Sequence, residues 1–403
     1  MAGKPRAEIR ESDIQGLKYF GKLLPLLARL HEVGCQRDKA GNRQLHYDEY
    51  CVLMLLAMFS PLVSSLRALQ QASELPKVQK RLGVGRVSLG SFSEAVQVFD
   101  PERLREIVEE VGAELAPLPH DPRLDELKQV VTLVDGTLLT ALPQIAAAFW
   151  GGQPTGQRDF AWRLHTHFEV LRGVPTKLTL TEPRSSGDNS ERYVLKQNLE
   201  ADRCYVKDRG YQSVELFNQI VAAHSSYVCR IQEKTHLEVV REYPLSDEAR
   251  SQNIVHDAVV KMGSDESPDH PVRVITLEVT PHVKRSGHKG DAGPANRGLL
   301  LIATNLLDVP AEIIALLFLY RWQIELFFRF FKCVLGCKHL LSHHPHGILI
   351  QTYCAILACL LISLWTGRKP TLRTHEMLCW YLLGLADEED LQRHVEKLKP
   401  HAR

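Results

Sequence analysis

Residues Pro310 to Lys338 read PAEIIALLFLYRWQIELFFRFFKCVLGCK, and the rest of the chain is best interpreted outward from this stretch. It predicts one long helix, because Asp308 can cap the N-terminus, Pro310 stands in the first turn, and nothing breaks the pattern before Gly336. Most of the stretch is apolar, so the helix is expected to be largely buried. From its middle onward it carries four charged residues: Arg321, Glu325, Arg329 and Lys332.

Three of these charges share one stripe of the predicted helix. At roughly 100° per residue, offsets of four and seven place Arg321, Glu325 and Lys332 on one side. A carboxylate between two cations on an apolar helix is costly unless it faces a cleft, a metal or a polyanion. The alternative is a row of salt bridges on a solvated face. The apolar residues between the charges leave little room for such a face, so we interpret the stripe as one wall of an active site.

Composition places the chain among ordinary globular proteins. It has 403 residues, enough for two or three domains, with 44% hydrophobic and 24% charged residues. The net charge of +1 predicts no overall attraction to nucleic acid, so a polyanion site must be local. Nine cysteines without paired spacing favour reduced thiols in the cytoplasm. The charged N-terminus lacks the apolar core of a signal peptide, and the apolar run 347–365 favours a buried helix over a membrane span.

Residues 1–128 predict a helical N-terminal region that is a candidate for binding DNA ends. The expected helices are Ser12–Val33, Tyr47–Phe59, Ser65–Ser73, Pro76–Leu82, Ser91–Phe99 and Pro101–Leu115. The short helices between Ser64 and Phe99 are compatible with a helix-turn-helix unit and equally with a plain helical bundle. Few basic residues there could contact phosphates, so the nucleic-acid signal is weak.

The pattern changes to alternating strands and helices at residue 129. The run Gln129–Asp135 predicts a buried strand that ends in an aspartate, and Arg203–Asp208 predicts a second strand of the same kind. Two strands joined by a turn, Trp162–Leu171 and Thr176–Thr181, and helices at Glu191–Leu199 and Ser213–Ala223 lie nearby in sequence. We therefore expect a mixed α/β layer with carboxylates at one edge.

The remaining segments predict an insertion and a helical tail. Residues 233–305 contain strand-like runs at Leu237–Tyr243, Val272–Val279 and Leu299–Ala303, and indicate a β-rich insertion. It includes a Gly-rich basic loop with Lys284, Arg285 and Lys289, which is either solvated surface or a phosphate contact. Residues 341–403 predict helices at His343–Trp365 and His375–Leu385. The catalytic core is thus assigned to residues 129–232 and 306–340.

Asp135, Asp208 and Glu325 are the candidate catalytic residues. Three carboxylates brought together stay ionised only if cations neutralise them, and hard oxygen ligands favour Mg²⁺ or Mn²⁺. Two such ions about 4 Å apart can activate a nucleophilic oxygen and stabilise the leaving oxygen of a phosphodiester. The basic residues expected to hold DNA phosphates are Arg321, Lys332, Arg209, Lys207 and Arg329, with Lys284, Arg285 and Lys289 of the basic loop.

A second cluster of possible metal ligands follows the long helix. Cys333 and Cys337 stand one helical turn apart, and four histidines follow by residue 346. They could bind zinc, but helical cysteine pairs are more often core residues, so we favour a structural role.

The segments VDGT, KDRGY and RWQIELFFRFFK resemble the three acidic blocks of insertion-sequence DDE transposases. The resemblance is closest to the family with the signature Y-(2)-R-(3)-E-(6)-K and covers about residues 45–365. It implies an α/β fold with a ribonuclease H-like mixed-sheet core, two divalent metal ions held by Asp135, Asp208 and Glu325, and cut-and-paste movement of DNA. It also implies double-stranded DNA partners, namely transposon terminal inverted repeats and target DNA, and a synaptic homodimer near the bacterial nucleoid.

Two departures from that family matter for mechanism. Phe318 stands where the signature has tyrosine, so the position has no hydroxyl, and the insertion has no tryptophan to hold a flipped base. Strand cleavage and strand transfer are expected, whereas a hairpin intermediate stays open. The alternatives are a nuclease of the same fold without strand transfer and a non-catalytic DNA-binding remnant of a transposase.

Overall fold

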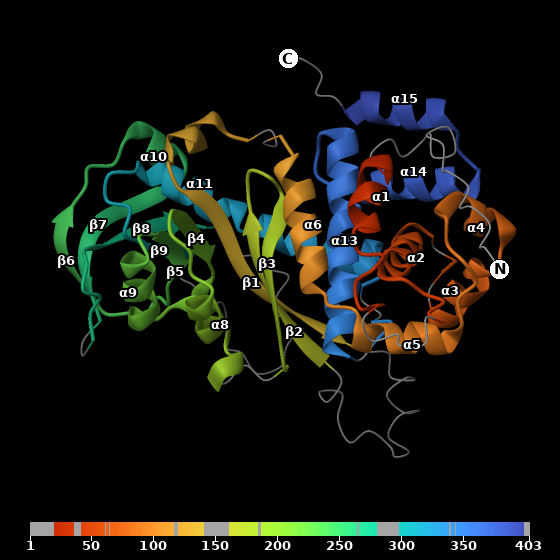
Figure 1. Cartoon of the computed structure of the whole chain (residues 1–403). Helices are drawn as coiled ribbons and strands as arrows, with labels where there is room; N and C mark the ends of the chain where they lie inside the picture. The colour runs from red at the N-terminus through yellow and green to blue at the C-terminus, as the bar shows by residue number, and fades with distance from the viewer. Residues whose placement is uncertain are drawn as a thin grey trace, which may run out of the picture.

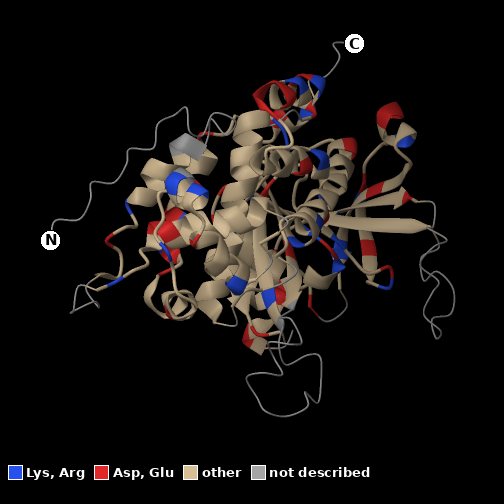
Figure 2. Ribbon diagram, turned by 90° about the vertical axis from the view of Figure 1, so that its right-hand side faces the viewer, with Lys and Arg blue, Asp and Glu red and all other residues tan. Residues whose placement is uncertain are grey.

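A computed structural model describes the chain at residues 20–35, 42–60, 62–63, 65–116, 120–140, 161–183, 187–263, 266–279, 298–337, 340–342 and 344–398. A nine-stranded sheet with helices on both faces occupies one side of the molecule, and a helical bundle occupies the other (Figure 1). Acidic and basic residues are interspersed along the described chain (Figure 2).

Five strands form the half of the sheet that carries the two predicted aspartates. They are β1 (Val130–Thr140), β2 (Ala161–Glu169), β3 (Val174–Thr181), β4 (Arg203–Lys207) and β5 (Ser226–Arg230). Their order is β3-β2-β1-β4-β5, with β2 antiparallel to both β1 and β3, and with β4 parallel to β1 and to β5. This order and these directions are those of the ribonuclease H-like fold, so the predicted fold class is confirmed.

The strands of the predicted insertion continue the same sheet instead of forming a separate layer. They are β6 (Leu237–Glu242), β7 (Ile254–Met262), β8 (Val272–Glu278) and β9 (Leu299–Thr304), and β9 pairs antiparallel with β5. The sequence did not predict β7, because His256 and Asp257 interrupt its apolar pattern. Asp257 is nevertheless buried, since both its carboxylate oxygens accept hydrogen bonds from Arg273 of β8, at 2.7 and 2.6 Å.

Helices cover the two faces of the sheet. On one face, α11 (Ala311–Tyr320) and α12 (Trp322–Arg329) pack on Leu133 of β1 and Val206 of β4. On the other face, α8 (Glu191–Gln197) and α9 (Val214–Ala222) pack on Val134 and Tyr205. The remaining short helices of this half are η3 (Pro122–Glu126), η4 (Gly187–Asn189), η5 (Arg209–Tyr211) and α10 (Asp247–Ser251).

The N-terminal and C-terminal regions, which the sequence analysis treated separately, share one core. They contribute α1 (Phe20–Ala28), α2 (Tyr47–Phe59), α3 (Leu66–Ser73), α4 (Pro76–Leu82), α5 (Leu89–Val98), α6 (Glu102–Ala113), α13 (Pro345–Thr366), α14 (Leu372–Leu383) and α15 (Glu388–Leu398). Figure 1 shows α13 standing between α6 and the other helices of the bundle. This helix is long and apolar enough to cross a membrane, but 89% of its most apolar window is buried inside the protein. It is the central helix of the bundle.

The stretch that predicted one long helix is divided into three segments. The helix α11 ends at Tyr320, α12 follows from Trp322, and a π-helical turn η7 (Phe330–Val334) completes the run. Pro310, not Asp308, precedes the first helical residue. In the π turn the Leu335 N–H donates to the Phe330 carbonyl at 3.1 Å. Such turns often occur at functional sites, and this one carries Lys332.

Candidate functional site

Asp135 and Asp208 lie side by side where β1 and β4 separate. The last paired residues of these parallel strands are Leu133 and Val206, and each aspartate follows two positions later. Neighbouring strands are about 4.8 Å apart, and residues two apart in a strand share a face. Both carboxylates therefore belong to the face that α11 and α12 cover. Asp135 is not at a strand end as predicted, since β1 continues, paired with β2, to Thr140.

The Asp135 carboxyl is enclosed by charges from several elements. Its pKa is raised to about 6, chiefly by burial and also by the nearby carboxylates of Glu191 and Glu325. The Gly136 N–H, which donates to Oδ1 at 2.8 Å, and the Arg321 guanidinium act in the opposite direction. Asp135 therefore lies within electrostatic reach of Glu325 and also of Glu191, which the sequence did not single out.

Asp208 has an unsatisfied acceptor. It follows β4 in an extended conformation and precedes η5, and its Oδ1 atom is buried without a hydrogen-bond partner. The Arg230 guanidinium lies 3.9 Å from this atom, beyond hydrogen-bond distance. A buried carboxylate oxygen without a partner is costly unless a ligand satisfies it. This atom fits a site for a cation.

Glu325 is held by the arginine one turn before it. Its Oε1 accepts a hydrogen bond from Arg321 Nη1 at 2.6 Å, and the Arg321 side chain is almost fully buried. The guanidinium carbon lies 5.7 Å from the ring centre of Phe318 and 5.4 Å from that of Trp322. Phe318 thus supports Arg321 through its ring face, although it cannot donate a hydrogen bond.

Lys332 completes the group on this side of the sheet. It is half-buried in the π turn, where burial lowers its pKa and the charges of Cys333 and Asp135 oppose that shift. The structure therefore brings Arg321, Glu325 and Lys332 to the part of β1 that carries Asp135.

The other predicted DNA contacts are distributed differently. Arg209, next to Asp208, and Arg329 on α12 are exposed. Lys207 is fully buried on the opposite face, with its ammonium 4.8 Å from the ring centre of Phe217 and 5.4 Å from that of Tyr227. A side chain enclosed in this way does not reach a phosphate, so we leave Lys207 out of the DNA interface. Lys284, Arg285 and Lys289 lie outside the described residues.

Within the described ranges no three His, Cys, Asp or Glu side chains are close enough to hold one metal ion. At the acidic trio the reason is visible, because Glu325 is turned toward Arg321. In the Cys/His segment, Cys337 is buried and Cys333 is exposed, whereas His339 and His343 lie outside the described residues.

Glu191 is the site residue that the sequence analysis missed. It is the first residue of α8, and its Oε1 accepts a hydrogen bond from Arg163 Nη1 of β2 at 2.5 Å. Tyr211 is buried, its hydroxyl has no partner, and burial followed by the charges of Glu191 and Asp135 raises its pKa. An acidic residue at a helix start is ordinarily interpreted as a favourable partner of the helix dipole, so its sequence carries no distinct signal.

The strand order and directions described above define a ribonuclease H-like domain. The chain belongs to the Transposase DDE domain family, whose model matches residues 126–361. It is 25% identical over 240 residues to a putative transposase, y4zB, of Sinorhizobium fredii (strain NBRC 101917 / NGR234), covering 59% of this chain and 62% of that protein.

Two further proteins are similar to this chain. The chain is 24% identical over 204 residues to a probable transposase for insertion sequence element IS5377 of Geobacillus stearothermophilus, covering 50% of this chain and 48% of that protein. The chain thus spans about half to three fifths of these two relatives. A solved piggyBac transposase synaptic complex with hairpin DNA aligns with 99% of this chain and 87% of its own, at a TM-score of 0.43 and 11% identity.

Proposed function

We propose that this protein is a DNA transposase that cleaves DNA at transposon ends with the help of divalent metal ions and joins the ends to target DNA. The observation that carries the proposal is the placement of Asp135 and Asp208 on neighbouring strands, with Glu325, Arg321 and Lys332 brought over the same part of β1 by the segments α12 and η7. Membership of the transposase family supports the class of reaction.

Asp135, Asp208 and Glu325 would hold the metal, with two Mg²⁺ or Mn²⁺ ions as the expected number. The buried Asp208 Oδ1 without a partner fits an ion ligand, and the oxygen donors suit these hard cations. When bound, the ions would supply activation of the attacking water or 3′-hydroxyl and stabilisation of the leaving oxygen. Glu325 uses Oε1 to bind Arg321, so an ion would compete with Arg321 for this oxygen and DNA phosphate is the natural alternative partner for the guanidinium.

Double-stranded DNA is the proposed partner, first as terminal inverted repeats and then as target. Arg321, Lys332, Arg209 and Arg329 would contact its phosphates, with the basic loop at residues 284, 285 and 289 as a further contact. A homodimer would hold two ends together, in the bacterial cytoplasm at the nucleoid. Cleavage and strand transfer are sequential steps at one site, because the 3′-hydroxyl freed by the first is the nucleophile of the second.

The test is nicking of a duplex that carries the inverted repeats flanking the gene, measured with Mg²⁺ and with EDTA. Asp135→Ala, Asp208→Ala and Glu325→Ala should each lower the cleavage rate by at least about 1,000-fold, while binding of the duplex persists. Glu200→Gln, at the opposite end of the strands, is the matched control and should cleave normally. Cleavage by Glu325→Ala at the parental rate would contradict the assignment of Glu325 as a catalytic residue. Nicking by the parental protein without joining to a target duplex would identify a nuclease instead.

A further inference from the structure

The Glu191 carboxylate reaches the backbone next to both aspartates. A Cβ atom added to Gly136 would lie 3.0 Å from Glu191 Oε1, and one added to Gly210 would lie 3.6 Å from Oε2. Gly136 follows Asp135 directly, and Gly210 stands two residues after Asp208. The two oxygens of one carboxylate therefore face the middle of β1 and the turn that follows β4, from the α8 side of the sheet, whereas Glu325 comes from the α12 side.

Glycine at position 136 leaves room for the Glu191 side chain beside β1. Its backbone φ is not positive, so the conformation does not itself require glycine. The three atoms nearest to an added Cβ at this position all belong to Glu191. A side chain there would therefore crowd Glu191 before any other group. The missing side chain allows the carboxylate to approach the strand that bears Asp135.

The surroundings of Glu191 are incompletely satisfied. Arg163 binds Oε1 through Nη1, but its Nε is buried without a partner, and so is the hydroxyl of Tyr211. The Tyr211 side chain is 2% exposed and lies within electrostatic range of Glu191 and Asp135. Asp208 Oδ1, whose residue precedes Gly210 by two positions, is likewise buried without a hydrogen-bond partner. Buried polar groups without partners indicate a site completed by a ligand.

We propose that Glu191 is a fourth carboxylate of the cation site, which Arg163 neutralises until a divalent ion takes the place of the arginine between Glu191 and the two aspartates. The inference rests on the proposed function, because it needs Asp135 and Asp208 to be metal ligands. Each of the two glutamates is then held by an arginine until an ion binds. Arg163 binds Glu191 on one face of the sheet and Arg321 binds Glu325 on the other, each at no more than 2.6 Å. The site would then bind its ions from both faces.

Binding of Mn²⁺ to the purified full-length chain without DNA, followed by the loss of the free-ion EPR signal, tests this role separately from activity. Glu191→Gln keeps the shape of the side chain and removes its charge, and should raise the Mn²⁺ Kd by about 10–100-fold. Glu200→Gln is the matched control, because Glu200 is also a partly buried partner of an arginine but lies at the far end of β4. A Glu191→Gln Kd within about twofold of the control would overturn the inference.

Two more variants separate the possible failures. Gly136→Ala should weaken Mn²⁺ binding in the parental protein but not in the Glu191→Gln background, because the added methyl group acts through Glu191. An equal loss of Mn²⁺ affinity in both backgrounds would show that the methyl group does not act through Glu191. Asp135→Asn should abolish binding at this site. If it does so while Glu191→Gln binds normally, only the fourth carboxylate is refuted. If Asp135→Asn binds normally, the acidic site of the proposed function is refuted as well.

Discussion

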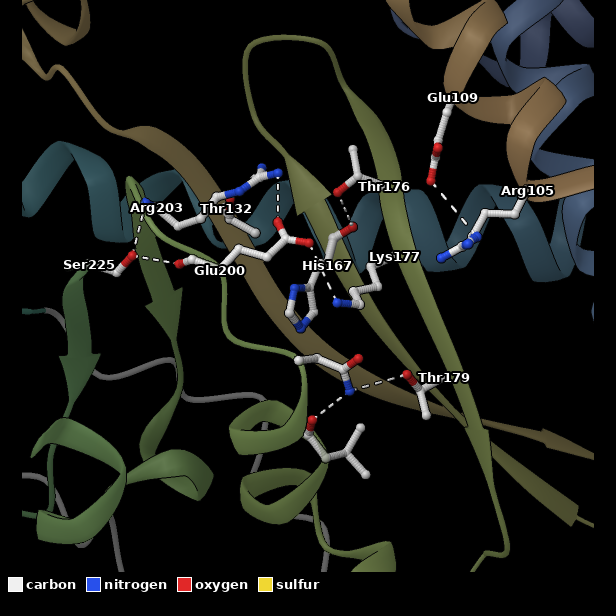
Figure 3. Close-up of polar contacts among 12 residues, drawn as sticks. Arg105, Glu109, Thr132, His167, Thr176, Lys177, Thr179, Glu200, Arg203 and Ser225 are labelled. Carbon is white, nitrogen blue, oxygen red and sulfur yellow. Dashed lines mark hydrogen bonds and ion pairs between the residues drawn. The ribbon is translucent and has the colours of Figure 1, made fainter. Parts of the chain in front are cut away.

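The two ends of strands β1, β2 and β4 carry similar charged residues, but these residues are paired completely at one end and incompletely at the other. At the end where β4 begins, Arg203 binds Glu169 at 2.6 Å and Glu200 at 2.8 Å, and Glu200 also lies 3.5 Å from Lys177. The Arg203 N–H donates to Ser225 Oγ, which in turn donates to the Glu200 carbonyl (Figure 3). Within the described residues, every buried charged or hydroxyl atom of this network has a hydrogen-bond partner.

At the other end, where β4 leads to Asp208, the same residue types remain partly unsatisfied. Asp208 Oδ1, Arg163 Nε and Arg321 Nε are buried without partners, and burial among carboxylates raises the pKa of Asp135. Folding alone would favour pairing these groups as completely as at the Arg203 end. One end therefore stabilises the sheet, whereas the other leaves polar groups unpaired at a cost in stability, as the proposed binding of ions and phosphate at this end requires.

The largest effect is expected when a charge is removed from the paired end, the end that contains Arg203. Glu169→Gln removes a buried carboxylate from Arg203, with the side chain only 9% exposed, and leaves part of the arginine charge uncompensated. We expect the free energy of unfolding to fall by about 3 kcal/mol, as for other broken buried ion pairs. Urea denaturation at pH 7 measures this loss.

Cleavage per folded molecule of Glu169→Gln should stay at the parental level, because Glu169 pairs with Thr132, three residues before Asp135, and binds Arg203 instead of the site residues. A variant that keeps its stability but loses cleavage would reverse the roles assigned to the two ends.

Sequence patterns located the elements well where the pattern is local. The helices Tyr47–Phe59 and Pro76–Leu82 have the predicted bounds, since a capping residue or proline marks the start and the apolar run marks the length. The two aspartates were predicted from their position after apolar runs. Parallel pairing of β1 with β4 then brings them together, which spacing along the chain could suggest but not establish.

The features that the sequence did not reveal depend on contacts between distant residues. The helix that begins at Ala311 breaks at Arg321 without a proline or glycine, at the residue that pairs with Glu325. The strand β7 was missed because a buried Asp257 is acceptable only beside Arg273. Glu191 was missed because its proximity to Gly136 follows from how α8 packs on the sheet.

The cost assigned to the unsatisfied end can be measured at Asp135. Its pKa of about 6 lies above the value of 3.8 expected in the unfolded chain, so the native state binds the proton more tightly. The stability of the metal-free protein therefore falls as pH rises from about 4 to 6, and the penalty is complete above pH 6. Asp135→Asn should raise the free energy of unfolding by up to about 3 kcal/mol at pH 8.

This gain should shrink to about 0.5 kcal/mol at pH 4, where the native carboxyl carries its proton and the unfolded carboxyl is only partly protonated. Thermal unfolding of both proteins in EDTA at pH 4, 6 and 8 provides the measurement. A gain that is independent of pH would show that the substitution acts through packing and not through the charge of Asp135.

The smallest expected effect concerns phosphate binding at the same end. Lys332→Ala should weaken binding of an end duplex roughly tenfold at moderate salt, and should lower the slope of log K against log salt by about one, because one phosphate contact is lost. Lys177→Ala, at the paired end, removes an equal charge that is occupied by Glu200 and should leave this slope unchanged. Equal slopes for the two variants would mean that Lys332 neutralises Asp135 within the protein and does not contact DNA, and the acidic end would then need another source of phosphate contacts, with Arg209 and Arg329 as the exposed candidates.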